Sequence, residues 1–433
     1  MPDEKQDRPI RVLVVAHQAS ERIGGAEALP LRLFGGLRAR GVEAWLVTHD
    51  STRAELSALL PAAELRRIVF VPSLPGLAAV FTWGKRLPAG ARTIAWGITQ
   101  LERQVAMVPV VRRLVRDLRI DVVHQPLGVS PVTPSPLARL GAPVVMGPLI
   151  GGMELPPAFR GRDSALAALV KKARPAVAQV MNLVVRGRRS ADVLLVADER
   201  TRALLPGPER HRAITATIIG VELASWPARA GRSGHDSQPA GPTRFLFIGR
   251  LIDWKGVDLV LEAFARVGQQ IPAQLEIAGD GPERPRLEAQ ARGLGCADHV
   301  TFAGWLEPVD CARRLQACDV FVSAALLECG GIAVLEAMAS GRPVIATAWG
   351  GHLDTVADRA GVLVDVSSRA TLVGGLADQM LRLAGDPELR SRLGAAGRRL
   401  VEERYDWDML TGQRLSVYAG LLARGQGSPS VPR

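Results

Sequence analysis

Residues 328–336 read Glu-Cys-Gly-Gly-Ile-Ala-Val-Leu-Glu, which places two carboxylates eight positions apart around a pair of glycines. The apolar residues after Gly331 are typical of a helix that begins at the glycine pair. Unpaired N–H groups and the dipole at the start of such a helix favour a phosphate above Gly330. Glu328 precedes the helix and Glu336 lies on its first turns. One carboxylate can therefore accept hydrogen bonds from sugar hydroxyls and the other from a ribose, as in a nucleotide-sugar site.

Length and pattern predict two α/β domains. A chain of 433 residues is too long for one ordinary core, and two domains of about 200 residues each are the natural expectation. Short β-like runs alternate with amphipathic helical stretches, as in a parallel sheet covered by helices. The expected strands are 12–16, 44–48, 121–124, 144–147, 193–196 and 217–219, and then 244–248, 274–278, 300–303, 320–323, 344–347 and 361–364. Residues 226–243 are rich in Gly, Ser, Pro and Ala and read as a linker.

Several segments resemble one known family. Residues 245–256, 277–282, 302–304, 328–336 and 341–347 look like the donor-binding half of a retaining glycosyltransferase of family 4, also called group 1. Residues 24–27, 121–124 and 219–222 carry a weaker resemblance in the first half. The resemblance as a whole implies the GT-B fold: two doubly wound, Rossmann-like domains that face each other across a cleft, with a C-terminal helix crossing back. The implied domains are 1–225 with 408–433 for the acceptor and 244–407 for the nucleotide sugar.

Two cations are the first expected catalytic residues. Arg250 and Lys255 are five positions apart, at a strand end and the start of the next helix. A departing nucleoside diphosphate gains negative charge in the transition state, which nearby cations stabilise. The resemblance implies this role for both residues. The alternative interpretation is that Arg250 and Lys255 are two ordinary surface cations.

The glycine pair supplies the expected donor-binding backbone. The resemblance assigns Glu328 to the reaction centre, and Gly330, Gly331, Ile332 and Glu336 to the donor. The family often has a bulky aromatic residue where Gly330 stands. A glycine there would widen the floor of the sugar pocket or let the loop shift, so the identity of the sugar does not follow.

Three residues of the first half complete the expected site. His124 ends the strand 121–124, and the matching family residue touches the donor sugar, although a histidine in this place is often structural. It is not assigned as a general base, because in retaining enzymes of this type the leaving phosphate is thought to take the acceptor proton. Gly24 and Gly25 follow the first strand and would let the backbone approach the diphosphate, unless they form an ordinary turn.

No metal or other cofactor is expected beyond the nucleotide sugar itself. Residues 406–408 read Asp-Trp-Asp and resemble the metal motif of a different glycosyltransferase fold. They precede a predicted helix, however, where Asp serves as an N-cap, and Arg250 and Lys255 already supply positive charge. Gly350, Gly351 and His352 follow the strand 344–347 and line the same cleft by position, with no assigned role.

The net charge of +11 is concentrated in the first half. Residues 1–240 carry 33 Lys and Arg against 20 Asp and Glu, a net +13, whereas residues 241–433 carry 21 against 23, a net −2. Cationic stretches at 85–119 and 160–189 are read either as solvated helix faces or as a surface that docks on an anionic membrane leaflet. Nucleic acid is not an expected partner, because interleaved aromatics are missing. Docking on a membrane would suggest a lipid-linked acceptor.

The start of the chain and its cysteines bear on location. No signal-peptide core and no apolar stretch of roughly 18 residues is present, so we expect a cytoplasmic protein, peripheral on the inner membrane face if the second reading holds. The four cysteines lack a Cys-x-x-Cys pair and read as reduced packing residues.

The expected function is transfer of a hexose from a nucleoside-diphosphate sugar to an acceptor hydroxyl with retention of configuration, in polysaccharide or glycolipid assembly. Two alternatives remain. A nucleotide-sugar epimerase shares the architecture but is not expected to show this set of residues in this order. A non-catalytic partner subunit could keep the fold without turnover.

Overall fold

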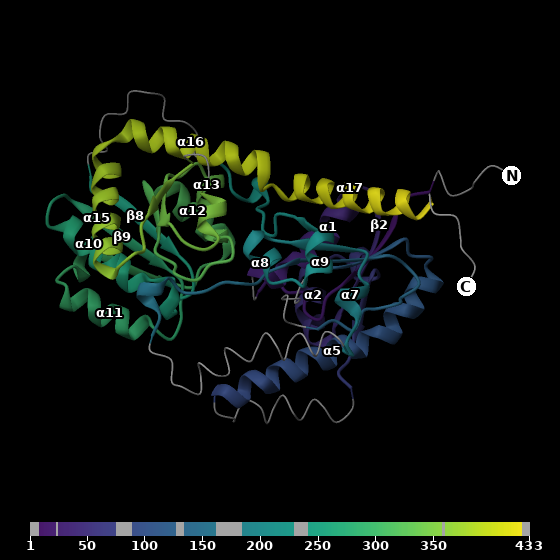
Figure 1. The fold of residues 1–433 in the computed structure, drawn as a ribbon. Coiled ribbons are helices and arrows are strands. Elements are labelled where there is room, and N and C mark those ends of the chain that lie inside the picture. Colours follow the sequence, from purple (N-terminus) through teal and green to yellow (C-terminus); the bar gives the residue numbers. More distant parts are fainter. Residues whose placement is uncertain are drawn as a thin grey trace. The chain divides into compact units, whose positions relative to one another are not determined.

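The chain forms two compact units, each built on a parallel sheet (Figure 1). The computed structural model describes residues 8–22, 25–74, 89–126, 134–161, 184–228, 241–356 and 360–426. The N-terminal unit comprises Met1–Gly152, Ser164–Ile218 and Leu410–Arg433, and the C-terminal unit comprises Met153–Asp163 and Ile219–Met409.

The N-terminal sheet has seven strands among the described residues, in the order β3-β2-β1-β4-β5-β6-β7. Neighbouring strands pair in parallel throughout. The strands are β1 (Arg11–Val15), β2 (Glu43–His49), β3 (Ile68–Val71), β4 (Val122–Gln125), β5 (Val144–Leu149), β6 (Val193–Val196) and β7 (Ala213–Thr215).

The C-terminal sheet has six strands among the described residues, in the order β10-β9-β8-β11-β12-β13, again parallel. They are β8 (Thr243–Ile248), β9 (Ala273–Ala278), β10 (Val300–Gly304), β11 (Val320–Ser323), β12 (Val344–Thr347) and β13 (Val362–Val364). Both sheets therefore follow the doubly wound order, and the expected fold class is confirmed. In such sheets ligands bind at the carboxyl ends of the strands where the order reverses, here between β8 and β11.

Helices cover the faces of each sheet. Those of the N-terminal unit are α1 (Leu29–Ala39), α2 (Arg53–Leu59), α3 (Ala62–Leu65), α5 (Ala89–Asp117), α7 (Gly187–Ser190), α8 (Glu199–Ala203) and α9 (Gly207–Arg212). Those of the C-terminal unit are α10 (Val257–Gly268), α11 (Arg284–Gly293), α12 (Pro308–Ala317), α13 (Ile332–Ala339), α14 (His352–Thr355), α15 (Arg369–Gly385) and α16 (Pro387–Arg404), and α17 (Trp407–Gln426) follows. Short 3-10 turns are η1 (Gly25–Ala28), η2 (Asp50–Thr52), η3 (Pro157–Phe159), η4 (Leu223–Ser225), η5 (Asp253–Lys255) and η6 (Ala297–His299).

Alternation along the strands builds the cores. In β1, Leu13 belongs to one apolar cluster with Met107 and Val111 of α5, whereas Val14 belongs to another with residues of α1. Successive strand residues point to opposite faces, so a sheet with helices on both sides needs an apolar run such as 12–15. In the C-terminal unit, α10 and α15 lie side by side and bury their apolar faces in one cluster with β8 (Figure 1).

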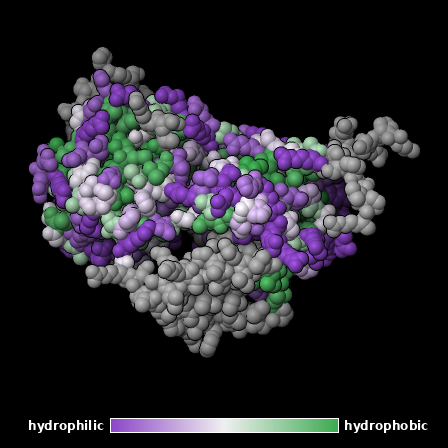
Figure 2. All heavy atoms as spheres, viewed as in Figure 1, coloured by the Kyte–Doolittle hydropathy of each residue, from purple (hydrophilic) through white to green (hydrophobic). Residues whose placement is uncertain are grey.

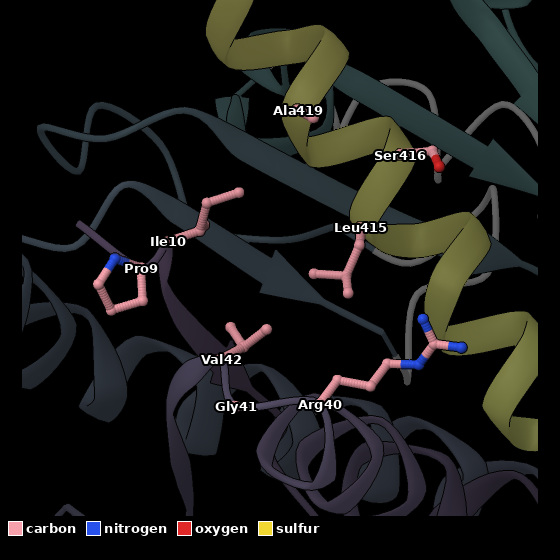
Figure 3. Close-up of a pocket in the computed structure, with 8 residues that line it drawn as sticks. All are labelled: Pro9, Ile10, Arg40, Gly41, Val42, Leu415, Ser416 and Ala419. Atoms are coloured by element: carbon pink, nitrogen blue, oxygen red, sulfur yellow. The ribbon is translucent and has the colours of Figure 1, made fainter. Parts of the chain in front are cut away.

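The last helix returns to the N-terminal unit, to which residues from Leu410 onward belong. Tyr418 of α17 is fully buried in the cluster that contains Val14. A shallow hollow of about 430 Å³ lies at this helix, and Figure 3 shows the residues that line it. It is lined mainly by apolar groups of α17, of the turn before β2 and of the two residues before β1: Pro9, Ile10, Arg40, Gly41, Val42, Leu415, Ser416 and Ala419.

Two strand expectations were inaccurate in the N-terminal unit. The strand expected at 217–219 lies instead at Ala213–Thr215, which pairs with β6; Ala216 makes the last bond to β6, to Val196. The strand β3, Ile68–Val71, was not predicted, because a four-residue edge strand that pairs only with β2 carries too short a pattern.

Candidate functional site

Lys255 and Glu328 form an ion pair at the carboxyl ends of β8 and β11. Lys255 ends η5, and its ammonium group donates a hydrogen bond to Glu328 Oε2. Both side chains are largely buried, at 22% and 17% exposure. Burial alone would raise the pKa of Glu328, but the charge and the hydrogen bond of Lys255, together with smaller effects of His352 and the Cys329 N–H, outweigh burial and lower it. The sequence-predicted cation and carboxylate thus meet at the point where the strand order reverses.

Gly256 holds the lysine loop in place. It adopts a left-handed conformation with φ of 66°, and a Cβ there would lie 2.2 Å from the carbonyl oxygen of Ala324. Only glycine combines this backbone conformation with so close an approach. The loop that carries Lys255 therefore packs directly on the loop that leads to Glu328.

Arg250 lies at the same edge, two residues after β8, and its side chain is exposed. Its guanidinium forms no ion pair with the described part of the chain. The preceding Gly249 touches the turn after β9, since a Cβ on Gly279 would lie 1.9 Å from the Gly249 carbonyl oxygen. The 277–282 motif thus supports the backbone beside Arg250.

The glycine pair leads into α13 as expected, with Gly331 as the N-cap in the left-handed region at φ of 66°. The helix begins at Ile332, and the half-buried Glu336 lies on it. The helix start, which the phosphate prediction requires, therefore lies four residues after Glu328.

The space at Gly330 is filled. A Cβ on Gly330 would lie 2.5 Å from Ile219 Cδ1, so Ile219 packs where a larger residue would project. The expected widening of the pocket floor at this position is therefore wrong. An isoleucine distant in sequence compensates for the missing side chain.

Two residues from the first half of the sequence contact the loops that follow β11 and β12 in the C-terminal unit. Met153 Sδ lies 3.1 Å from Cys329 Sγ, and the Trp349 indole N–H donates to the Glu154 carbonyl oxygen at 2.7 Å. Sequence reasoning missed both contacts, because nothing in the pattern of 153–161 marks it as part of the C-terminal unit.

His352 is the residue whose environment the sequence underestimated. It begins α14, is fully buried, and places Nδ1 2.9 Å from Thr347 Oγ1. Burial lowers its pKa to about 4, with Glu328 and Lys255 acting in opposite directions. A Cβ on Gly331 would lie 3.0 Å from its Nε2, which places the ring against the start of α13.

His124 belongs to the N-terminal unit and is fully buried on β4. Its Nε2 lies 2.7 Å from the Gly147 carbonyl oxygen, and its Nδ1 is hydrogen-bonded to the Tyr418 hydroxyl. A carbonyl only accepts, so Nε2 carries the hydrogen and Nδ1 accepts from Tyr418. Burial lowers the pKa of His124 to about 3. With both nitrogens occupied, these contacts favour the structural alternative.

The remaining expected residues are less informative. Gly24 lies outside the described residues, and Gly25 begins η1. Asp406 precedes α17 and forms an isolated bridge with Val221. In the described ranges, no group of three or more His, Cys, Asp or Glu is arranged to hold a metal ion. The four cysteines are free, and three of them are buried.

One arginine that was expected on the cationic surface is buried. Arg188 is 2% exposed and pairs with the buried Glu209 at 2.6 Å, so it belongs to the interior. Arg186 and Arg189 are exposed, whereas Lys171, Lys172 and Arg174 lie outside the described residues. Figure 2 shows hydrophilic side chains over much of the visible surface of both units. Within the described residues, no helix has the length and apolar character needed to cross a membrane.

Sequence comparisons match parts of the chain. Residues 235–400 match the family model of glycosyl transferases group 1. Over 177 residues, 39% of this chain and 44% of the relative, the chain is 37% identical to a GDP-mannose-dependent monoacylated alpha-(1-6)-phosphatidylinositol monomannoside mannosyltransferase of Corynebacterium glutamicum. Over 241 residues, 53% of this chain and 61% of the relative, it is 30% identical to alpha-D-kanosaminyltransferase of Streptomyces kanamyceticus. The chain spans about half the length of the curated relatives it matches.

Solved structures match nearly the whole chain. Sucrose-phosphate synthase of Thermosynechococcus elongatus superposes with a TM-score of 0.65 at 20% identity, covering 96% of this chain and 100% of that one. HepE of Anabaena in complex with UDP-glucose gives 0.61 at 15% identity, covering 95% and 100%. These likenesses show that the two units have the GT-B fold.

Proposed function

We propose that this chain, which belongs to the group 1 glycosyltransferases and has the GT-B fold, transfers a hexose from a nucleoside-diphosphate sugar to an acceptor hydroxyl with retention of configuration. The observation that carries the proposal is the Lys255–Glu328 pair, which lies at the reversal of the strand order, with Glu328 four residues before the start of α13. A structural ion pair alone would not require the surrounding glycines or the free helix start.

The charges divide between the two parts of a nucleotide sugar. Arg250 and Lys255 face the departing diphosphate, and the N–H groups at the start of α13 add positive dipole character. Glu328, kept ionised by Lys255, accepts hydrogen bonds from sugar hydroxyls. Glu336 serves the ribose, and the backbone of Gly330, Gly331 and Ile332 lies closest to the phosphates.

In the proposed reaction the bond between the anomeric carbon and the diphosphate oxygen breaks as the acceptor oxygen bonds to that carbon on the same face. The acceptor proton passes to the leaving diphosphate, so no side chain serves as general base. Lys255 stabilises the charge that develops on the leaving group. His124, with both nitrogens engaged in the N-terminal unit, supports the protein around β4 and takes no part in proton transfer.

We further propose that the acceptor is lipid-linked and bound by the N-terminal unit. The excess of positive charge in the first half supports contact with an anionic membrane surface. The Corynebacterium relative is named for a phosphatidylinositol mannoside acceptor, which is a lipid. Exposed arginines such as Arg186 and Arg189 belong to this surface, whereas the buried Arg188 does not.

A nucleotide-sugar panel tests the proposal. UDP-, GDP- and ADP-sugars are compared for thermal stabilisation, because a ligand that binds the folded state raises apparent stability by mass action. The best donor is then incubated alone, and release of nucleoside diphosphate is followed. We expect one base to be preferred and slow hydrolysis to occur. Binding without any turnover would favour the non-catalytic alternative, and no binding at all would contradict the proposal.

A further inference from the structure

The hydrogen atoms around His352 can be assigned from the geometry. Thr347 Oγ1 lies 2.6 Å from the Ala325 carbonyl oxygen and 2.9 Å from His352 Nδ1. A hydroxyl has one hydrogen, and a carbonyl oxygen can only accept it, so Thr347 donates to Ala325. Thr347 must therefore accept from His352 Nδ1–H. The buried ring is neutral, and its Nε2 carries a lone pair and no hydrogen.

This lone pair has no donor in the described part of the chain, although the ring is fully buried. A buried acceptor without a hydrogen bond destabilises a protein, so such atoms commonly receive a partner from a ligand or water. The edge of the ring that holds Nε2 lies against Gly331, since a Cβ there would be 3.0 Å from Nε2 and 2.9 Å from Cδ2. Neither Gly330 nor Gly331 has a side chain that would shield it.

The chemistry of the missing partner follows from the lone pair. At neutral pH a diphosphate oxygen has no hydrogen to donate and would be repelled, whereas a sugar hydroxyl donates readily. The adjoining Glu328, which also acts on the His352 ring through its charge, is an acceptor as well. Two acceptors beside the glycine pair suit a group with several hydroxyls.

We propose that His352 Nε2 accepts a hydrogen bond from a hydroxyl of the donor sugar and so helps determine which sugar is used. The inference rests on the proposed function. It assigns the ring to the sugar, while Arg250, Lys255 and the start of α13 hold the diphosphate. The fully buried ring lies directly against Gly331, so a sugar hydroxyl reaches Nε2 when the glycine pair shifts.

Calorimetric binding of UDP, GDP and ADP, and of UDP-glucose, GDP-mannose and ADP-glucose, tests the inference. The measured quantity is the ratio of affinities for the sugar nucleotide and its nucleoside diphosphate. His352→Leu removes the acceptor at similar volume, and we expect it to lower this ratio by about 3- to 10-fold, the worth of one neutral hydrogen bond. Affinity for the diphosphate alone should not change.

Two further variants separate the lone pair from packing. His352→Gln can place an oxygen near the position of Nε2, and we expect it to restore much of the ratio. Thr347→Val leaves the ring in place but removes the acceptor that fixes its tautomer, so the ratio should fall as well. Melting temperatures verify folding of each variant.

The outcomes are distinct. An unchanged ratio in folded His352→Leu would overturn the inference, and so would equal weakening of sugar nucleotide and diphosphate, which would assign the ring to the phosphates. If the wild-type protein bound none of the six nucleotides, the proposed function would fail and the inference with it.

Discussion

Replacing Lys255 by methionine removes the ammonium group and keeps most of the apolar stem. Lys255 is the largely buried cation at the proposed leaving group, so its loss should lower turnover by about 10²-fold, or about 2.7 kcal/mol of transition-state stabilisation. The donor should still bind, because the helix start and Arg250 remain.

The same change should alter the titration of Glu328. Its ordinary pKa of 4.5 is lowered in the folded protein because Lys255 outweighs burial. Without Lys255 burial is the largest remaining influence on Glu328, opposed by the smaller effects of His352 and of the Cys329 N–H, and the pKa should rise above 4.5. Protonation of Glu328 then occurs at a higher pH than in the wild type, so the donor KM of the variant should begin to rise at a higher pH as the solution is acidified.

The pH dependence of stability should also change with the pKa of Glu328. In the wild type the lowered pKa contributes stability above the unfolded value, and this contribution is lost as the pH falls through the folded pKa. In Lys255→Met the carboxylate is buried and unpaired, so the loss of stability should be greatest at neutral pH and smaller in acid. The double variant Lys255→Met/Glu328→Gln has no unpaired charge and should regain part of the loss.

Initial rates against donor concentration between pH 5 and 8, with melting temperatures at the same pH values, check these expectations. Turnover within threefold of wild type in folded Lys255→Met would refute the role of the cation. An unchanged pH dependence of KM would refute the coupling of Lys255 to Glu328.

Four other predictions concern backbone, charge, acid and metal. Gly256→Ala should lower the free energy of unfolding by about 2 kcal/mol or more, because Gly256 has a left-handed conformation and an added Cβ would meet the Ala324 carbonyl oxygen. The control variant Gly268→Ala should be neutral or stabilising, because an added Cβ there has nothing within 4 Å. Equal melting temperatures of the two variants would contradict this prediction. Arg250→Ala should cut turnover by about 10²-fold at unchanged melting temperature, because the side chain is exposed; turnover equal to wild type would remove Arg250 from the site. The free energy of unfolding should fall as the pH drops from about 6.5 towards 4, because the pKa of His352 is lowered to about 4 in the folded protein, so the histidine is protonated at a higher pH in the unfolded chain. If His352 is the cause, the free energy of unfolding of His352→Leu should depend less on pH over this range. Sugar transfer should persist in EDTA. Complete loss of transfer in EDTA, with recovery on addition of Mg²⁺, would show that Arg250 and Lys255 do not suffice to stabilise the leaving diphosphate.

Local signals in the sequence predicted most of the fold. Alternating apolar runs and turns gave the two parallel sheets, and the glycine pair predicted the start of α13 to within a residue. These features depend on neighbouring residues, so a single sequence contains them. Short edge strands such as Ile68–Val71 carry too few residues for a clear pattern.

Contacts between distant residues could not be predicted. The resemblance placed Lys255 and Glu328 in one site, but the ion pair between them, across 73 positions, depends on the strand order β8-β11. Ile219 fills the space at Gly330 from outside the motif, and Arg188 is buried against Glu209 although its surroundings in the sequence read as a charged surface.

The role of His352 depended on hydrogen placement. Its position after β12 placed it near the expected site, but the free lone pair follows only from the Thr347 and Ala325 contacts. For His124, the sequence left a structural and a functional alternative. Tyr418, 294 positions away, and Gly147 occupy its ring nitrogens and favour the first.

The anomeric configuration of the product tests the central claim most directly. The preferred nucleoside-diphosphate sugar is incubated with the enzyme with water as the acceptor, and the anomeric proton of the released free sugar is followed by ¹H NMR before that sugar mutarotates. Transfer with retention predicts that an α-linked donor first yields the α-anomer, and that Lys255→Met slows its appearance about 10²-fold. A first product with inverted configuration, or a rate that does not depend on Lys255, would contradict it.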